Sequence, residues 1–205
     1  MEDGRETNRL RLQPVSNLHG LGLIHLVRSI RVEQGFRAPW FRPRAFTHLD
    51  LRHFSTLANV HTLKLQYLDI DLFVPTLEHH FGHFSQTLRS ITLYDPWCTP
   101  RQLSHFLSLF SNLDNIGIRN TCTPSLTTST ADMKLVPFSA LKPRGRLALH
   151  NVSWVEAWTH LITSSSDLRF RHMFLYAARS CAPILFKACA ETLETLQLGG
   201  VDDSE

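Results

Sequence analysis

The chain has 205 residues, of which 43% are apolar and 19% are charged, and its formal net charge is +3. This length favours one large domain or an elongated array, and the apolar fraction excludes a chain that is disordered as a whole. The small net charge lacks the basic excess that phosphate neutralisation needs, so nucleic-acid binding is expected to be unlikely.

The sequence also predicts where the protein resides. The first apolar stretch, 18–27, is broken by two glycines and two histidines, so no signal peptide is expected. No run reaches the roughly 18 apolar residues of a membrane span. The four cysteines contain no C-x-x-C pair and are expected to be reduced and mostly buried. Together these features predict an intracellular protein, cytoplasmic or nuclear.

Residues 1–45 form a poorly patterned N-terminal segment with one possible repeat strand at 27–32. The following run, 37–46, interleaves arginines with aromatic residues, as surfaces for single-stranded nucleic acid do. A nucleic-acid-associated binding module that uses this cluster is therefore the alternative function. A loop whose aromatic residues cover the end of an array explains the run equally well.

Residues 46–205 carry a recurring apolar pattern of the form L-x-x-L-x-L. The last positions of successive copies are Leu65, Leu93, Ile118, Leu149, Leu175 and Leu198, at spacings of 28, 25, 31, 26 and 23 residues. Four of these spacings lie in the range of about 20 to 29 residues typical of leucine-rich repeats. The long spacing coincides with a Thr/Ser-rich stretch at 120–137, which predicts a loop inserted in one repeat.

The segments between the copies are predicted to be helical. Thr99 can cap a helix with Pro100 at its first position and a stripe of Leu103, Phe106, Leu107 and Phe110. Further helices are expected at 46–57, at 72–84, after Ser153 and at Pro183. Short strands that alternate with helices predict an α/β leucine-rich-repeat solenoid, with parallel strands on the concave side and helices on the convex side.

Three stretches carry a resemblance to a known family: LANVHTLKLQYLDI, LRSITLYDPWCTPRQLSHFLSLFSNLDNIGI and CAPILFKACAETLETLQL. They resemble the irregular leucine-rich repeats of fungal F-box-like proteins, over roughly residues 46–198. The resemblance implies the substrate-recognition repeats of a ubiquitin-ligase receptor. No stretch resembles the F-box itself, so a ligase adaptor is expected as a partner only if an F-box lies upstream.

The chain departs from the standard repeat three positions after the last leucine, where that repeat has asparagine. The residues found there are Leu68, Pro96, Thr121, Val152, Ala178 and Val201. We therefore expect no asparagine ladder, and irregular turns after the strands.

Because strand side chains alternate between faces, the residues between and after the leucines should line the concave side. Leu93, Ile118 and Leu175 should be buried on the other side. The predicted partner-binding residues are Lys64, Tyr94, Arg119, His150, His172, Phe174 and Tyr176, which include types favoured at interface hot spots. We therefore expect a non-enzymatic module that binds a protein target. The alternative is an ordinary polar sheet face without a binding role.

No catalytic residue, metal or cofactor is predicted. His79, His80 and His83 lie close together, but the order H-E-x-x-H is not met, and solvated or half-buried histidines on a helix are expected instead. No phosphate-binding glycine motif and no nucleophile signature is present. The chain ends seven residues after the last strand motif, so an open sheet edge that allows self-association is expected.

Overall fold

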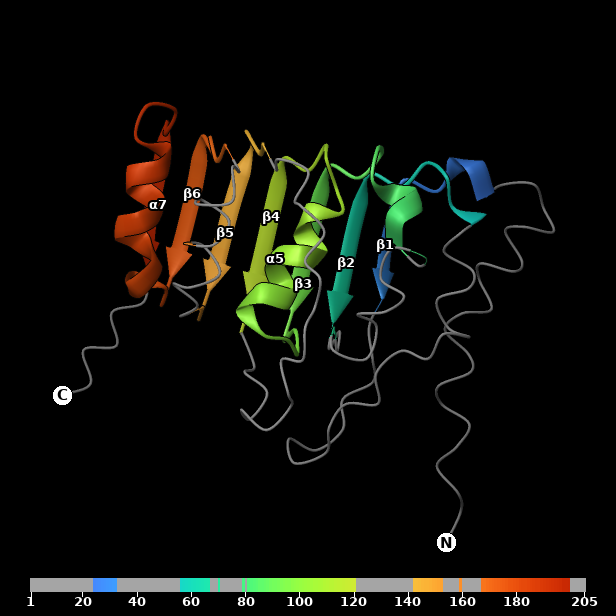
Figure 1. Cartoon of the computed structure of the whole chain (residues 1–205). Helices are drawn as coiled ribbons and strands as arrows, with labels where there is room; N and C mark the ends of the chain where they lie inside the picture. The colour runs from blue at the N-terminus through green and yellow to red at the C-terminus, as the bar shows by residue number, and fades with distance from the viewer. Residues whose placement is uncertain are drawn as a thin grey trace, which may run out of the picture.

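The computed structural model describes residues 24–32, 56–66, 70, 79, 81–120, 142–152, 159 and 167–199. Their seven strands form one parallel sheet in the order β1-β2-β3-β4-β5-β6-β7 (Figure 1). The strands are β1 (Ser29–Val32), β2 (Thr62–Gln66), β3 (Ser90–Tyr94), β4 (Asn115–Arg119), β5 (Arg146–His150), β6 (His172–Tyr176) and β7 (Thr195–Gly199). The α/β class and the parallel sheet predicted from the sequence are confirmed.

The register of the sheet follows the leucine pattern. Leu93 pairs with Leu65 on one side and with Ile118 on the other, and Leu149 pairs with Leu175. In β2 to β6 the second and fourth residues of each strand are buried, as the alternation of side chains requires. Leu93 and Ile118 are 0% exposed and Leu175 is 3% exposed, so their predicted burial is confirmed.

The helix predicted after Thr99 is confirmed as α5 (Pro100–Ser108). The Thr99 hydroxyl accepts a hydrogen bond from the N–H of Gln102 at 3.3 Å, and the Gln102 side chain accepts one from the N–H of Thr99 at 2.7 Å. This capping box satisfies two donors that a helix start otherwise leaves without partners. Proline follows the cap, where the absence of an N–H costs nothing.

The other helical elements are shorter. Helix α7 (Ala182–Cys189) begins one residue before the predicted Pro183, with Leu185 and Cys189 buried. Three 3-10 turns lie wholly within the described residues: η1 (Ile24–Leu26), η4 (Gly82–Phe84) and η5 (Arg179–Cys181). Of the stripe predicted at 72–84, the structure describes the C-terminal part, where Phe81 and Phe84 are buried.

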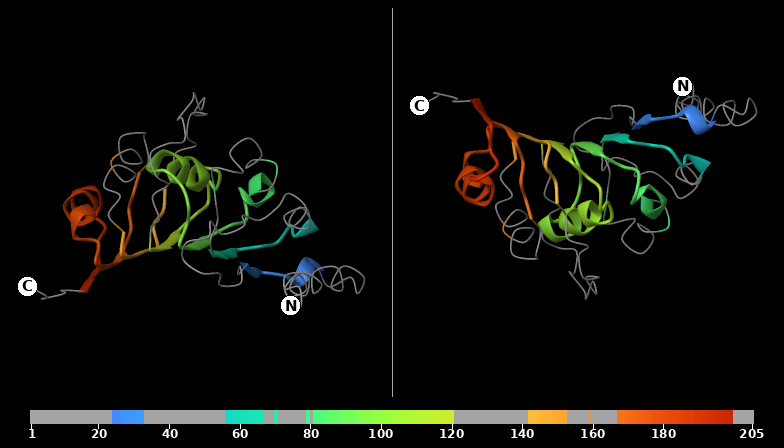
Figure 2. Two further views of the ribbon diagram at one scale, coloured as in Figure 1. Left: turned by 90° about the horizontal axis from the view of Figure 1, so that it is seen from below. Right: turned by 90° about the horizontal axis from the view of Figure 1, so that it is seen from above.

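Helices α5 and α7 and the turn η4 lie on the same side of the sheet (Figure 2). The core fills the space between them and the strands. Phe106 of α5 makes edge-to-face contacts with Phe81 at 5.2 Å and with Phe110 at 5.4 Å between ring centroids, a geometry that aromatic pairs favour. The opposite face of the sheet is therefore the one that the described helices leave open.

Several predictions fall largely or wholly outside the described residues. These are most of the N-terminal segment 1–45 with its Arg/aromatic cluster 37–46, most of the helix at 46–57, the helix after Ser153, nearly all of the 120–137 loop, and His80. The predicted strand at 27–32 is the exception, since it contains β1, which pairs with β2.

Candidate functional site

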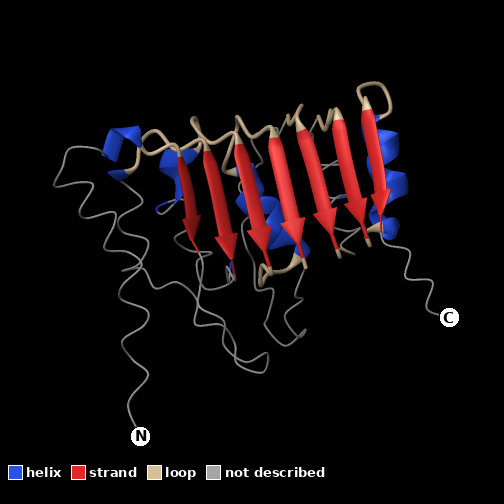
Figure 3. Ribbon diagram, turned by 180° about the vertical axis from the view of Figure 1, so that it is seen from behind, coloured by secondary structure: helices blue, strands red, loops and turns tan. Residues whose placement is uncertain are grey.

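The candidate site is the open face, which we define as the side chains at the first, third and fifth positions of β2 to β7. Figure 3 shows these strands in front and the described helices behind them. A hollow of about 730 Å³ lies on this face, with lining residues from every strand between β2 and β7. The hollow is open to solvent and extends across six strands, so it is a broad shallow surface rather than an enclosed cleft.

Six of the seven predicted binding residues line the hollow: Lys64, Tyr94, Arg119, His150, Phe174 and Tyr176. His172 is half-buried at the start of β6 and is not one of the lining residues. Arg146, which the strand pattern places on the concave side but which was not chosen as a binding residue, lines the hollow from the start of β5. The sequence shows Arg146 next to the first strand leucine, but it does not show that Arg146 lies over the ring of Phe174 on β6.

The rings and the cations of the open face form defined pairs across neighbouring strands. The guanidinium of Arg119 lies 5.4 Å from the ring centroid of Tyr94, and that of Arg146 lies 4.0 Å from the ring centroid of Phe174. The rings of His150 and Tyr176 stack at 4.4 Å with an interplanar angle of 8°. At exposed sites a cation–ring contact contributes about 0.5 to 1 kcal/mol, so these pairs favour the observed side-chain orientations before a ligand arrives.

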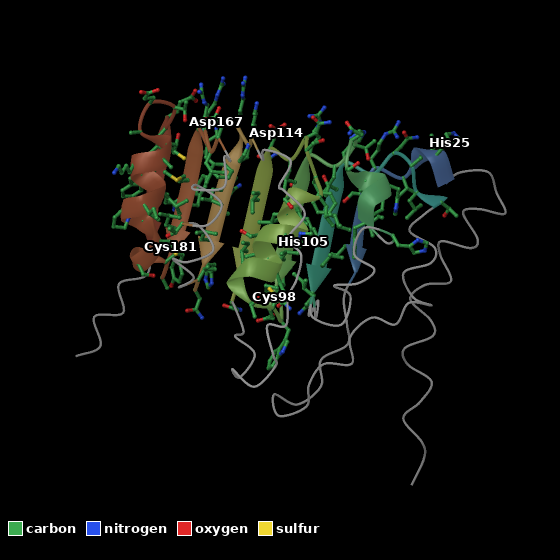
Figure 4. The ribbon with its side chains drawn as sticks, viewed as in Figure 1. His25, Cys98, His105, Asp114, Asp167 and Cys181 are labelled. Atoms are coloured by element: carbon green, nitrogen blue, oxygen red, sulfur yellow. The ribbon has the colours of Figure 1, made fainter. Side chains whose placement is uncertain are left out.

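The open face is basic. The seven strands contain four full cations, Arg31, Lys64, Arg119 and Arg146, and no aspartate or glutamate. The ion pairs at the strand starts lie beside this face rather than on it: Arg169 with Asp167 at 2.8 Å, and Arg171 with Glu194 at 3.6 Å. Figure 4 labels Asp114 and Asp167 at the strand-start edge of the sheet.

The turns after β3, β4, β5 and β6 are regular, so the expectation of irregular turns was wrong. The first residue after each strand has a positive φ: 49° at Asp95, 50° at Asn120, 53° at Asn151 and 46° at Ala177. The N–H of each of these residues donates to the last carbonyl of the next strand, at 2.8 to 3.1 Å. The repeated turn therefore fixes the backbone next to Tyr94, Arg119, His150 and Tyr176.

A short side-chain ladder links three of these turns. Asn151 donates to Asn120 Oδ1 at 3.5 Å, and Asn120 hydrogen-bonds to the side chain of Asp95. The ladder lies one residue before the position that the standard repeat uses, and at that standard position Pro96, Val152 and Ala178 are buried. Burial raises the pKa of Asp95, although the hydrogen bond from Asn120 acts in the opposite direction.

At the start of β5 the N–H of Arg146 is bound by a side chain and not by a backbone carbonyl of β4. Asn115 Oδ1 accepts a hydrogen bond from the N–H of Arg146 at 2.9 Å, and the N–H of Gly145 donates to the carbonyl of Asp114 at 3.2 Å. The register of β4 with β5 begins one residue later, at Ile116 and Leu147. Asn115 therefore positions the backbone of Arg146 at the rim of the hollow.

The last strand leaves apolar side chains uncovered. Leu196 is 42% exposed and Leu198 is 62% exposed, whereas their partners on β6, Met173 and Leu175, are buried. Within the described residues, β7 pairs with β6 alone. The edge of β7 is thus a second surface with free backbone groups and apolar side chains.

Other candidate groups lie apart from the open face. His79 is exposed and His83 packs on Phe84 at 3.9 Å between ring centroids. No group of three His, Cys, Asp or Glu with the geometry of a metal site occurs among the described residues. Cys98, Cys181 and Cys189 are buried and form no disulfide, and burial raises the pKa of the thiols of Cys181 and Cys189.

Within the part of the chain that the structure describes, no helix has the length and apolar character needed to cross a membrane. No family model, no curated protein and no solved structure matches the chain.

Proposed function

We propose that the chain is a non-enzymatic binding module, a leucine-rich-repeat solenoid that holds a protein partner on its open face. One observation carries the proposal: six residues chosen from the sequence as contact residues surround a single hollow of about 730 Å³. Aromatic residues and arginine are the types that contribute most to protein interfaces. Their pairing across the strands keeps their conformational freedom low before binding, which reduces the cost of association.

The solenoid part of the proposal rests on the sequential order of the strands and on the repeated turns. Each strand pairs with the next one along the chain, and each of the four turns makes the same hydrogen bond. One strand with one crossover encloses no core, so such units become stable by stacking on their neighbours. The leucine spacing and this stacking together support the repeat architecture.

The test of the binding role begins with selection of ligands from a displayed random-peptide library by the purified chain. Binding of the selected peptides is then measured by calorimetry for two variants. One replaces Tyr94, Arg119, Phe174 and Tyr176 by alanine, and the control replaces Lys187 and Glu191, which are exposed on α7 and just beyond it. The first variant should lose binding and the control should retain it. Loss of binding in the control alone would overturn the proposal.

The role of a ubiquitin-ligase receptor is a further part of the proposal and requires an F-box. Its support is the resemblance of the repeats, and an adaptor becomes a partner only where an F-box precedes Met1 in the full gene product. Sequencing the transcript upstream of Met1 tests this part. An open reading frame without an F-box would remove the ligase adaptor from the proposal and leave the binding module.

We also propose self-association through the edge of β7. A strand without Lys, Pro or a carboxylate, with Leu196 and Leu198 exposed, has none of the usual protection of a sheet edge. A second copy of the chain could pair with this edge and cover both leucines. Sedimentation velocity should show a dimer that Leu198→Lys dissociates, and a wild-type monomer at high concentration would refute it.

An intracellular location completes the proposal. Cys98, Cys181 and Cys189 are buried and form no disulfide, as is usual in proteins kept in a reducing compartment. A fluorescent fusion of the chain should distribute to the cytoplasm or nucleus, and secretion of the fusion would overturn this point.

A further inference from the structure

We infer that the partner held by the open face is an acidic protein segment that also carries aromatic or apolar residues. The inference rests on the proposed binding role of this face and adds the chemistry of the partner. Although the net charge of the whole chain is small, its charged side chains are distributed unevenly over the surface.

The described carboxylates are sorted away from the open face. They are Asp95, Asp114, Asp167, Glu191 and Glu194, and all five lie outside the strands. All fully charged side chains on the strands are positive. No described carboxylate forms an ion pair with Lys64, Arg119 or Arg146. A face with one sign of charge attracts ligands of the opposite sign and disfavours others.

The two arginines at the hollow are prepared to bind carboxylates. Each guanidinium lies over a ring, Arg119 over Tyr94 and Arg146 over Phe174. Stacking of this kind uses one face of the guanidinium and leaves the N–H groups at its edge available for the forked hydrogen bonds that arginine makes to carboxylates. Both side chains are exposed, so a ligand can reach them.

The spacing of the cations suits an extended peptide. Lys64 on β2 lines up with Gly117 on β4, so Arg119 is two strands and two residues away from it, or about 12 Å at about 4.8 Å per strand and about 3.3 Å per residue. Side chains four residues apart lie on the same face of an extended chain and span about 13 Å, so two carboxylates at this spacing can reach both cations. Arg146 lies at the strand-start end of the face, because Arg119 pairs with His150, and it therefore contacts a separate part of the partner.

The rings supply the apolar part of the surface. Phe174 is half-buried in the hollow, and Tyr176, stacked on His150, is 47% exposed. Phe174 lies beside Arg146. Tyr176, in contrast, lies at the strand ends in line with His150 and Arg119. A partner therefore meets an aromatic group and a cation at both ends of the strands. A segment that alternates carboxylates with aromatic or apolar residues matches both features.

Nucleic acid fits this face less well. Each of the rings of Tyr94, Phe174 and Tyr176 already has one face covered by Arg119, Arg146 or His150. Binding of single strands uses stacking on open ring faces together with a continuous basic track along the backbone. The three cations of the open face, Lys64, Arg119 and Arg146, lie on three of its six strands and fit separate carboxylates better.

The test uses two pools of short peptides of matched composition. One pool contains Glu, Asp, Tyr, Phe, Leu and Gly, and in the other pool Gln and Asn replace Glu and Asp. The peptides that each pool yields are titrated against the whole chain by fluorescence anisotropy. The proteins compared are the wild type, Arg119→Glu, Arg146→Glu and, as a control cation on α7, Lys187→Glu. Circular dichroism verifies that every variant is folded.

The acidic pool should bind the wild type at least about tenfold more tightly than the neutral pool, because charge complementarity is lost in the latter. Each reversal at Arg119 or Arg146 should weaken acidic-pool binding by about tenfold or more, and Lys187→Glu should leave it unchanged. Equal affinity for both pools, with loss of binding in Phe174→Ala, would overturn this inference while the proposed binding role stands.

Two other outcomes are equally decisive. If neither pool and no peptide of the random library binds the open face, the proposed function itself fails. If a single-stranded oligonucleotide of equal charge binds more tightly than the acidic pool, with a steep dependence on salt and loss in the same reversals, the ligand is nucleic acid and the inference is wrong.

Discussion

Strands β3 and β7 carry the same apolar pattern but bury it to different extents. Ile91 and Leu93 of β3 are both 0% exposed, whereas Leu196 and Leu198 of β7 are 42% and 62% exposed. β3 has a paired strand on each side, and β7 has one only on the side of β6 in the described structure. Burial in this sheet is therefore set by the neighbouring unit as much as by the residue itself.

The turns after the strands differ in the same direction along the sheet. Asp95, Asn120 and Asn151 occupy the left-handed turn positions after β3, β4 and β5, and Ala177 occupies the one after β6. Aspartate and asparagine tolerate this conformation, which is costly for alanine. The middle of the sheet thus combines full burial with suitable turn residues, and the β6–β7 end lacks both.

The largest expected contrast comes from truncating equivalent leucines. Leu93→Ala removes a fully buried side chain and should lower the free energy of unfolding by about 2 to 5 kcal/mol. Leu198→Ala removes an exposed one and should lower it by less than about 1 kcal/mol. Urea unfolding followed by circular dichroism measures both. Equal losses would show that β7 is covered by part of the chain or by a second copy.

A second prediction concerns the junction between β4 and β5. A methyl group at position 145 would overlap Asn115 Oδ1 and lie 3.1 Å from the carbonyl oxygen of Asp114. Gly145→Ala should therefore displace the acceptor of the Arg146 N–H and cost about 1 to 3 kcal/mol of stability.

The matched control for this change is Gly82→Ala, since nothing lies within 4 Å of a methyl group at that position. Its melting temperature should equal or slightly exceed that of the wild type. A Gly145→Ala variant as stable as Gly82→Ala would mean that Asn115 does not hold the start of β5.

Substitutions at the turn positions should change the stability in opposite directions at the end and in the middle of the sheet. Ala177→Asn should raise stability by about 0.5 to 1 kcal/mol, because asparagine accepts a positive φ more readily than alanine. Asn151→Ala should lower it by a similar amount and also lose the hydrogen bond to Asn120. Differential scanning calorimetry of the two variants gives the comparison, and shifts of the same sign would contradict the role assigned to the turns.

The sequence predicts the strands and their register well. The motif places two apolar residues two positions apart, and a shift of the register by one residue would move both of them to the other face of the sheet. Thr99, followed by Pro100 and then Gln102, likewise predicts the start of α5. Both signals are local, because alternation and capping are decided by residues within a few positions of one another.

The site was predicted less completely because it depends on pairs across strands. Arg146 gains its role from Phe174 on the next strand, and the crossover from β5 to β6 separates the two residues in the sequence. The regular turns had a visible signal in Asp95, Asn120 and Asn151, but it stands one residue before the asparagine position of the standard repeat. His172 was chosen by its type, although it lies at the strand start outside the hollow.

The smallest expected effect comes from completing the asparagine ladder at its first position with Asp95→Asn. Burial raises the pKa of the Asp95 carboxyl, so the folded chain binds this proton more tightly than the unfolded chain, and the charged form opposes folding at neutral pH. The asparagine variant should therefore be slightly more stable than the wild type at neutral pH.

The difference in stability should shrink as the pH falls through the raised pKa of Asp95. It should vanish below the ordinary aspartate pKa, where the carboxyl is neutral in both the folded and the unfolded state. Thermal melts of the two proteins across this range measure it. A difference that stays constant with pH would show that folding does not shift the pKa of Asp95. A more stable wild type at neutral pH would show that the hydrogen bond from Asn120 outweighs burial at this turn.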